Sequence, residues 1–76
     1  MRSVYLGHID PIQNMDRFYT MILQETLFGE WSLVREWGRI GQGGQLMESH
    51  HTTAQEAQAC AEQILRQKLR KGYQIM

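Results

Sequence analysis

Apolar and polar residues alternate along the first two thirds of the chain, and this pattern predicts β-strands. The runs 2–9 and 16–26 are rich in aromatic and β-branched residues, which favour strands. Asp10-Pro11 should end the first run, because proline lacks an N–H donor and restricts the residue before it. The second run is apolar on both faces, as in a central strand. The first is expected at a sheet edge.

Two further strands are expected around a glycine-rich turn. The tetrapeptide 27–30 contains a glycine and joins the second run to a third, residues 30–40, as a hairpin. Three glycines in 41–44 can adopt the positive φ values of tight turns, and residues 45–51 return as a fourth strand. Alternate residues of the third run project to one face: Trp31, Leu33, Arg35, Trp37 and Arg39.

After residue 53 the spacing of apolar residues changes to three and four, which predicts a helix. Thr53 and Glu56 have the spacing of a capping box, and Gly72 is placed to stop the helix after about Lys71. Small residues come first in the apolar stripe, so the start of the helix should lie close to the sheet. The stripe consists of Ala57, Cys60, Ala61, Ile64 and Leu65, with Leu69 next in the series.

Together these elements predict an α+β fold, in which a small antiparallel sheet of four strands is packed against one long C-terminal helix. Residues 73–76 either add a short fifth strand or form a packed tail. The 76 residues suit one domain, so 1–76 is expected to fold as a unit. A chain of this size buries only ~60% of its unfolded surface, so each aromatic residue in the core matters.

Composition narrows the functional classes. The formal net charge is zero, so the field of the whole molecule does not predict binding to nucleic acid or membrane, and local patches must carry any such argument. The single cysteine, Cys60, excludes an internal disulfide and favours a reducing cytoplasm. Because no basic segment followed by an apolar core opens the sequence, no signal peptide is expected. No apolar run approaches the ~20 residues that cross a bilayer. A cytoplasmic protein without membrane contact is expected.

The third strand carries the most informative chemistry, because two indoles and two guanidinium groups share one of its faces. An aromatic ring can stack on a base or sugar, and an arginine can pair with a phosphate. Trp37 and Arg39 are therefore candidates for a nucleic-acid contact. Alternatively, Trp37 packs in the core under the helix and Arg39 pairs with a carboxylate such as Glu36 or Glu48.

Basic residues also gather at the end of the expected helix. Half of the eight lie within six positions: Arg66, Lys68, Arg70 and Lys71. Cations at a helix C-terminus complement the macrodipole, which accounts for such a cluster without a ligand. The other interpretation is a phosphate-facing patch, whose affinity would be strongly salt-dependent if it joined Arg39.

On the third strand, Trp31 is expected in the core and Arg35 in solvent.

The sequence predicts no metal site, no cofactor and no catalytic activity. His50 and His51 are adjacent on a strand, so they point to opposite faces and cannot easily share one ion. Cys60 lies on the apolar stripe and is expected to be a small buried residue. No Ser/His/Asp, Cys/His or paired-carboxylate arrangement stands out.

At Trp37-Gly38-Arg39 the chain resembles the WGR domain, which is named for this tripeptide. Residues 17–19, Arg-Phe-Tyr, resemble the first conserved strand of that family, and 31–45 look like its central hairpin. The helix end looks like that of compact bacterial members: Lys68, Lys71, Gly72 and Tyr73. The resemblance covers about residues 16–73 and implies an antiparallel sheet with a helix packed on it.

The resemblance also implies a function. In poly(ADP-ribose) polymerases a WGR domain helps to detect DNA breaks; its tryptophan stacks near the end of a strand, and its arginine contacts the backbone or a neighbouring domain. By position these roles would fall on Trp37 and Arg39. The chain shows no catalytic domain or zinc fingers, so it is similar instead to stand-alone bacterial members and to relatives described as molybdate-metabolism regulators.

The sequence thus predicts a non-enzymatic module that binds nucleic acid, with DNA as the expected ligand. The residues expected at the interface are Trp37, Gly38, Arg39, Gln42, Gln45, Lys68 and Lys71. The alternative is an adaptor that binds a partner protein and does not touch nucleic acid. A monomer is expected, or a weak homodimer formed by pairing of sheet edges.

Overall fold

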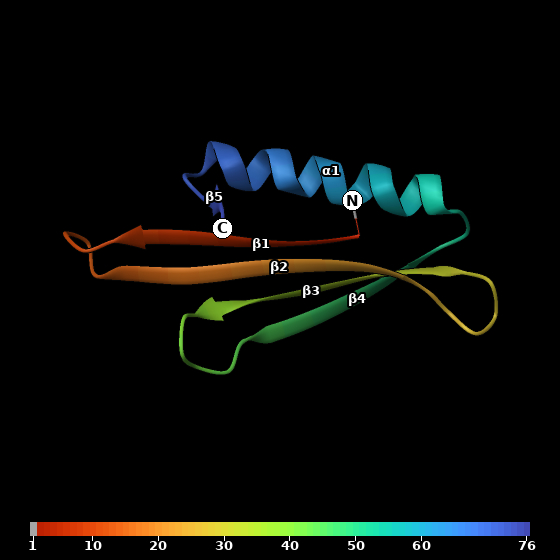
Figure 1. Ribbon diagram of the computed structural model, residues 1–76, viewed down its shortest axis with the longest axis horizontal. Helices are drawn as coiled ribbons and strands as arrows, with labels where there is room; N and C mark the ends of the chain where they lie inside the picture. Colours follow the sequence, from red (N-terminus) through yellow and green to blue (C-terminus); the bar gives the residue numbers. More distant parts are fainter. Residues whose placement is uncertain (1) are drawn as a thin grey trace.

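A computed structural model describes residues 2–76 of the chain. The elements within this range are β1 (Ser3–Asp10), β2 (Met15–Glu25), β3 (Trp31–Arg39), β4 (Gln45–His51), α1 (Ala54–Arg70) and β5 (Gln74–Ile75). The strands form one sheet in the order β4-β3-β2-β1-β5, and each neighbouring pair is antiparallel. The helix α1 lies along one face of this sheet (Figure 1). The expected α+β arrangement is confirmed.

The last residues of the chain add the short fifth strand. β5 pairs with β1 at two positions, Leu6↔Ile75 and Gly7↔Gln74. The sequence predicts β1 at a sheet edge. In the structure the end of the chain pairs with part of that edge, so β1 is not a free edge. β2 lies between β1 and β3, which confirms the central position that its two apolar faces predicted. The outer side of β4 is the long uncovered edge.

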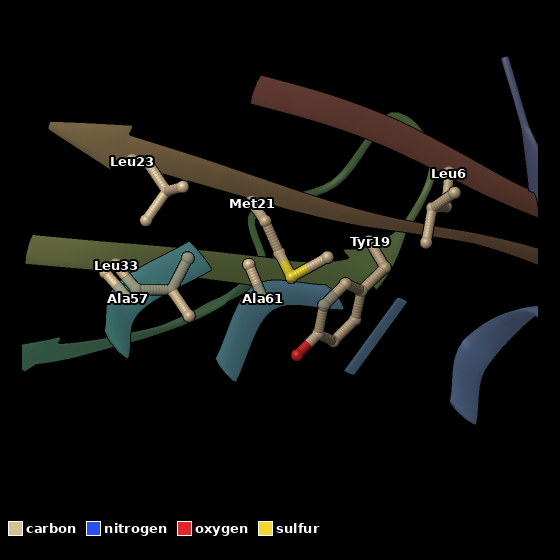
Figure 2. Packing of buried hydrophobic residues seen from close by; sticks show 7 residues of the cluster. All are labelled: Leu6, Tyr19, Met21, Leu23, Leu33, Ala57 and Ala61. Carbon is tan, nitrogen blue, oxygen red and sulfur yellow. The ribbon is translucent and has the colours of Figure 1, made fainter. Parts of the chain in front are cut away.

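The strand register determines which side chains face the helix. Tyr19 lies between Leu6 on β1 and Trp37 on β3, and Leu23 lies opposite Leu33. Figure 2 shows that these strand residues pack with two helix alanines to form the core: Leu6, Tyr19, Met21, Leu23, Leu33, Ala57 and Ala61. The odd-numbered face of β3, which holds both tryptophans, is therefore the face beneath α1.

The helix approaches the sheet through its small residues, as the sequence predicted. Ala57 and Ala61 are completely buried, and Ile64 is partly buried. The expected continuation of the stripe to Leu69 is wrong, because that side chain is 42% exposed. Lys68 continues the stripe and is partly buried, since it follows Ile64 by one helical turn and a lysine stem can lie on apolar surface.

Both ends of α1 are capped by local hydrogen bonds. The N–H of Glu56 donates to Oγ1 of Thr53 over 3.1 Å, as in the predicted cap. At the other end, Gly72 has φ +104°, and a Cβ at this position would lie 3.0 Å from the ring of His8. The N–H of Tyr73 donates to the carbonyl of Lys68. This turn brings Tyr73 back to the sheet.

Within residues 2–76, no helix has the length and apolar character needed to cross a membrane.

The N-terminal cap yields a stability test. Thr53→Ala removes the acceptor for the Glu56 N–H and should lower the free energy of unfolding by about 1 kcal/mol. Thr52→Ala is the matched control, because the neighbouring Thr52 is exposed and Thr53 supplies the cap. Urea unfolding followed by circular dichroism measures both variants. Equal losses would show that the cap does not stabilise this helix.

Candidate nucleic-acid interface

A pocket of about 450 Å³ lies where β3 ends and α1 stops. Its lining comes from β2, β3, α1 and the segment before β5: Arg17, Trp37, Gly38, Arg39, Lys68 and Tyr73. The fold therefore brings together the tripeptide and one lysine of the basic helix end, which lie some thirty residues apart in the sequence. We call this site the cationic pocket.

Tyr19 does not line the cationic pocket but contacts three of the side chains that do. It is 3% exposed, and its ring stacks on Trp37 with centroids 5.7 Å apart and an interplanar angle of 18°. Tyr73 meets the same ring edge-on at 6.3 Å. Nζ of Lys68 lies 4.6 Å from the Tyr19 centroid and 5.6 Å from that of Tyr73, within the range of cation–π attraction.

Arg35 supplies a further cation beneath the helix. Its Nη1 donates to the hydroxyl of Tyr19 over 3.3 Å, and its Nη2 lies 2.6 Å from Sδ of Met47. Its Nε is buried without a hydrogen-bond partner among the described residues. The expectation that Arg35 would be solvated is therefore wrong, because its parity places it on the helix-covered face. Its positive charge stays close to Lys68.

The pKa of Lys68 is lowered from the usual value of 10.5. Burial of the ammonium group is the largest cause, and the positive charges of Lys71 and Arg35 add to it. An anion entering the pocket would relieve the repulsion, so binding a phosphate should raise this pKa again. The lysine is thus in an environment that favours an added negative charge.

Neither expectation for Trp37 and Arg39 holds completely. Trp37 is not fully buried in the core, and Arg39 is not paired with a carboxylate among the described residues but is also not free of protein contacts. Trp37 is partly buried against the core and also lines the pocket. Arg39 is exposed, with Nη1 donating to the carbonyl of Asn14 over 3.3 Å and Nη2 to its Oδ1 over 3.4 Å. Pairing of Arg39 with Glu36 or Glu48 is wrong, because both acids project from the opposite face of the sheet. The guanidinium is held in place without being neutralised.

The charges in and around the cationic pocket are not balanced locally. Among residues 2–76, no carboxylate lies within 4.0 Å of Arg17, Arg39 or Lys68, and the ion pair in this range joins Glu48 to His50. Three acids lie on the other face of the sheet: Asp16, Glu36 and Glu48. Arg17, Arg39 and Lys68 therefore form no ion pair within residues 2–76, although one acid, Asp10, shares the helix-covered face at this end of the sheet.

Two glycines allow the close backbone approach at the start of the β3–β4 hairpin. A Cβ on Gly44 would collide with the carbonyl oxygen of Trp37 and lie 3.0 Å from Cζ of Phe18. A Cβ on Gly38 would lie 2.9 Å from Cα of Gly44. Gly38 thus lines the pocket and also permits the close approach of the two backbone segments. This approach sets the backbone position of the tripeptide.

Three of the expected interface residues lie outside the pocket lining. Gln42 is exposed in the turn, where its N–H donates to the carbonyl of Arg39. Gln45 is exposed opposite Trp37, and Lys71 is exposed at the helix cap. Conversely, sequence reasoning did not select Arg17 or Tyr73 as site residues. Their signal was the shared parity of Arg17 and Tyr19 and the position of Tyr73 just after the helix stop.

The remaining reactive side chains lie elsewhere. His50 is opposite Ser32 and His51 is opposite Trp31, so the two rings are on different faces, as expected. Within the described range, no three His, Cys, Asp or Glu side chains are grouped as metal ligands. Cys60 is partly rather than fully buried, because it lies at the margin of the helix face whose centre is Ala57 and Ala61.

Comparison with known proteins identifies the family. The family model described as the WGR domain matches residues 2–75, which is wider than the resemblance seen in the sequence. The chain belongs to the WGR family. It is also 41% identical over 70 residues to the uncharacterized protein y4dW of Sinorhizobium fredii (strain NBRC 101917 / NGR234). The match covers 92% of this chain and 34% of y4dW, so the WGR chain spans about a third of that relative's length. No solved structure matches it significantly.

The close backbone approach between Gly44 and the WGR tripeptide can be tested by substituting neighbouring glycines. Gly44→Ala should destabilise the domain by about 1–3 kcal/mol, the usual cost of overpacking, and should change the near-ultraviolet circular dichroism of the tryptophans. Gly43→Ala is the control, since a Cβ there meets nothing within 4 Å. Urea unfolding compares the two variants. If both unfold like the wild type, the close approach is not a constraint on the hairpin.

Proposed function

We propose that this WGR domain is a non-enzymatic module that binds DNA through the cationic pocket. The observation that carries the proposal is that Arg17, Arg39 and Lys68 converge beside exposed parts of two aromatic rings, with no carboxylate within 4.0 Å of them in the described chain. Phosphate contacts supply most of the affinity of nucleic-acid-binding proteins. Cations that lack a carboxylate partner can make such contacts without first breaking an ion pair.

The pocket offers separate roles for its two kinds of side chain. The guanidinium of Arg39, oriented by Asn14, can donate two hydrogen bonds to phosphate oxygens. The partly buried Trp37 presents only part of its ring, which suits a sugar or a base at the end of a strand. Stacking on Tyr19 restricts rotation of the indole, so little side-chain entropy would be lost on binding.

A protein partner is the second candidate, and a different surface favours it. Leu27 and Phe28 are 100% and 89% exposed in the turn between β2 and β3, at the other end of the molecule (Figure 1). Large apolar side chains in an exposed cluster often mark an interaction site. The two functions use different residues and can therefore be separated by mutation.

Titration of an end-labelled DNA duplex at several salt concentrations tests the DNA-binding function. Arg39→Ala should weaken binding by about 1.5 kcal/mol or more, the scale of a charged hydrogen bond. It should also reduce the slope of log K against log salt by about 0.9, the value for one lost phosphate contact. Lys68→Ala should lower the slope similarly. Trp37→Ala should reduce the affinity without changing the slope.

Arg2→Ala is the matched control for charge. Arg2 is exposed and precedes β1 at the end remote from the pocket, so its removal should leave the slope nearly unchanged. Circular dichroism confirms the folding of each variant. Equal affinity of the wild type and a folded Trp37→Ala, Arg39→Ala double variant would exclude the pocket as the DNA site.

A further inference from the structure

The β2–β3 turn presents two apolar side chains on an ordered backbone. The N–H of Thr26 donates to the carbonyl of Glu30 over 2.7 Å, and the N–H of Gly29 donates to the carbonyl of Thr26 over 3.2 Å. Oγ1 of Thr26 accepts from the N–H of Phe28, and Gly29 takes the positive φ of 79° that the turn requires. We call residues 26–30 the hairpin tip. Its hydrogen bonds hold Leu27 and Phe28 outward.

Acidic residues flank the exposed pair. Glu25 precedes the hairpin tip and Glu30 closes it, and both are exposed. In the described part of the chain, neither has a basic side chain within 4.0 Å. An aromatic side chain between two free carboxylates is suited to an aromatic-walled pocket with a basic rim. A membrane surface, which is usually anionic, would repel these carboxylates.

The same chain carries a pocket of that description at its opposite end. The molecule is 45 Å long, with the hairpin tip at one end of the long axis and the end of α1, which contributes to the cationic pocket, near the other (Figure 1). Trp37 and Tyr73 provide aromatic surface there, and Arg17 and Arg39 provide charges opposite in sign to those of the tip. The distance excludes insertion of a tip into its own pocket.

We propose that the hairpin tip of one copy docks into the cationic pocket of a second copy. Phe28 then contacts the aromatic walls, and Glu25 and Glu30 face the guanidinium groups of Arg17 and Arg39. Because the two surfaces differ, the contact is heterologous, and each added copy exposes a new tip and a new pocket. The outcome is head-to-tail association that increases with concentration and weakens with salt. DNA and the tip would compete for one site.

Sedimentation velocity of the chain at rising concentration and low salt tests the association. The wild type should exceed its monomer mass of 8.9 kDa progressively, and Phe28→Ser should remain monomeric. Ile12→Ser is the matched control, because Ile12 is 96% exposed in the β1–β2 turn. This variant should associate like the wild type. A wild type that is monomeric at every concentration, or that associates equally well with Phe28→Ser, overturns the proposal.

A mixing experiment distinguishes the head-to-tail contact from any symmetric dimer. Phe28→Ser retains the pocket, and Arg39→Glu retains the tip but reverses one charge of the pocket. Each variant alone should be monomeric, whereas the mixture should form a one-to-one dimer that does not grow further. Self-association of either variant, or a mixture that stays monomeric, overturns the proposal. Pairing along the exposed edge of β4 would give the first of these outcomes.

Duplex DNA added to the same samples separates this inference from the proposed function. Phe28→Ser should bind duplex at least as tightly as the wild type, and duplex should dissociate the wild-type assembly. Pairing of the two variants that persists at saturating duplex would refute the shared site while leaving the head-to-tail contact intact. Duplex binding without any self-association would leave the DNA-binding function intact and refute the docking.

Discussion

Tyr19 is buried on the central strand, and the arrangement of the cationic pocket depends on it. Its ring is stacked by Trp37 and lies below the ammonium group of Lys68, while its hydroxyl accepts a hydrogen bond from Arg35. The two helix alanines make this possible, because they let α1 approach the sheet closely enough for Lys68 to reach the ring. The core residue Tyr19, which Trp37 stacks on, and the helix α1, which supplies Lys68, therefore position the WGR tripeptide.

The distribution of charged residues makes the pocket favourable for anionic ligands. The chain has eight basic and eight acidic residues, yet Arg17, Arg39 and Lys68 gather at the pocket without an ion pair among residues 2–76. Three of the acids, Asp16, Glu36 and Glu48, lie on the other face of the sheet. Burial lowers the pKa of Lys68 most, and the positive charges of Lys71 and Arg35 add to the effect. These cations are not balanced by an ion pair among residues 2–76. A phosphate, or a carboxylate from another molecule, would relieve this imbalance. The net charge alone conceals this property.

Local signals in the sequence were sufficient to predict the elements. Strand alternation, the Thr53 cap and the Gly72 stop placed each element within about two residues, and the WGR resemblance was correct. The site was harder to predict because it depends on register. Parity placed Arg35, Trp37 and Arg39 on one face, but it does not specify which residue of the second strand lies opposite each of them or which face the helix covers. The pairing of Arg17 with Arg39, the position of Tyr19 beneath Lys68 and the partial burial of Arg35 all depend on these two features. Lys68 was recognised as basic, but its position on the apolar stripe was missed because polar residues are excluded when such a stripe is counted.

On the proposed function, nucleic acid contacts the indole of the WGR tripeptide beside cations that have no ion-pair partner among residues 2–76. The two tryptophans allow a direct test, since Trp31 and Trp37 lie on the same sheet face at opposite ends of β3. Their indole N–H resonances can be followed by NMR during titration with a duplex and assigned with a Trp31→Phe variant. We expect a saturable shift of the Trp37 resonance and little change for Trp31. A titration that moves only Trp31, or neither resonance at concentrations where binding saturates, would contradict it.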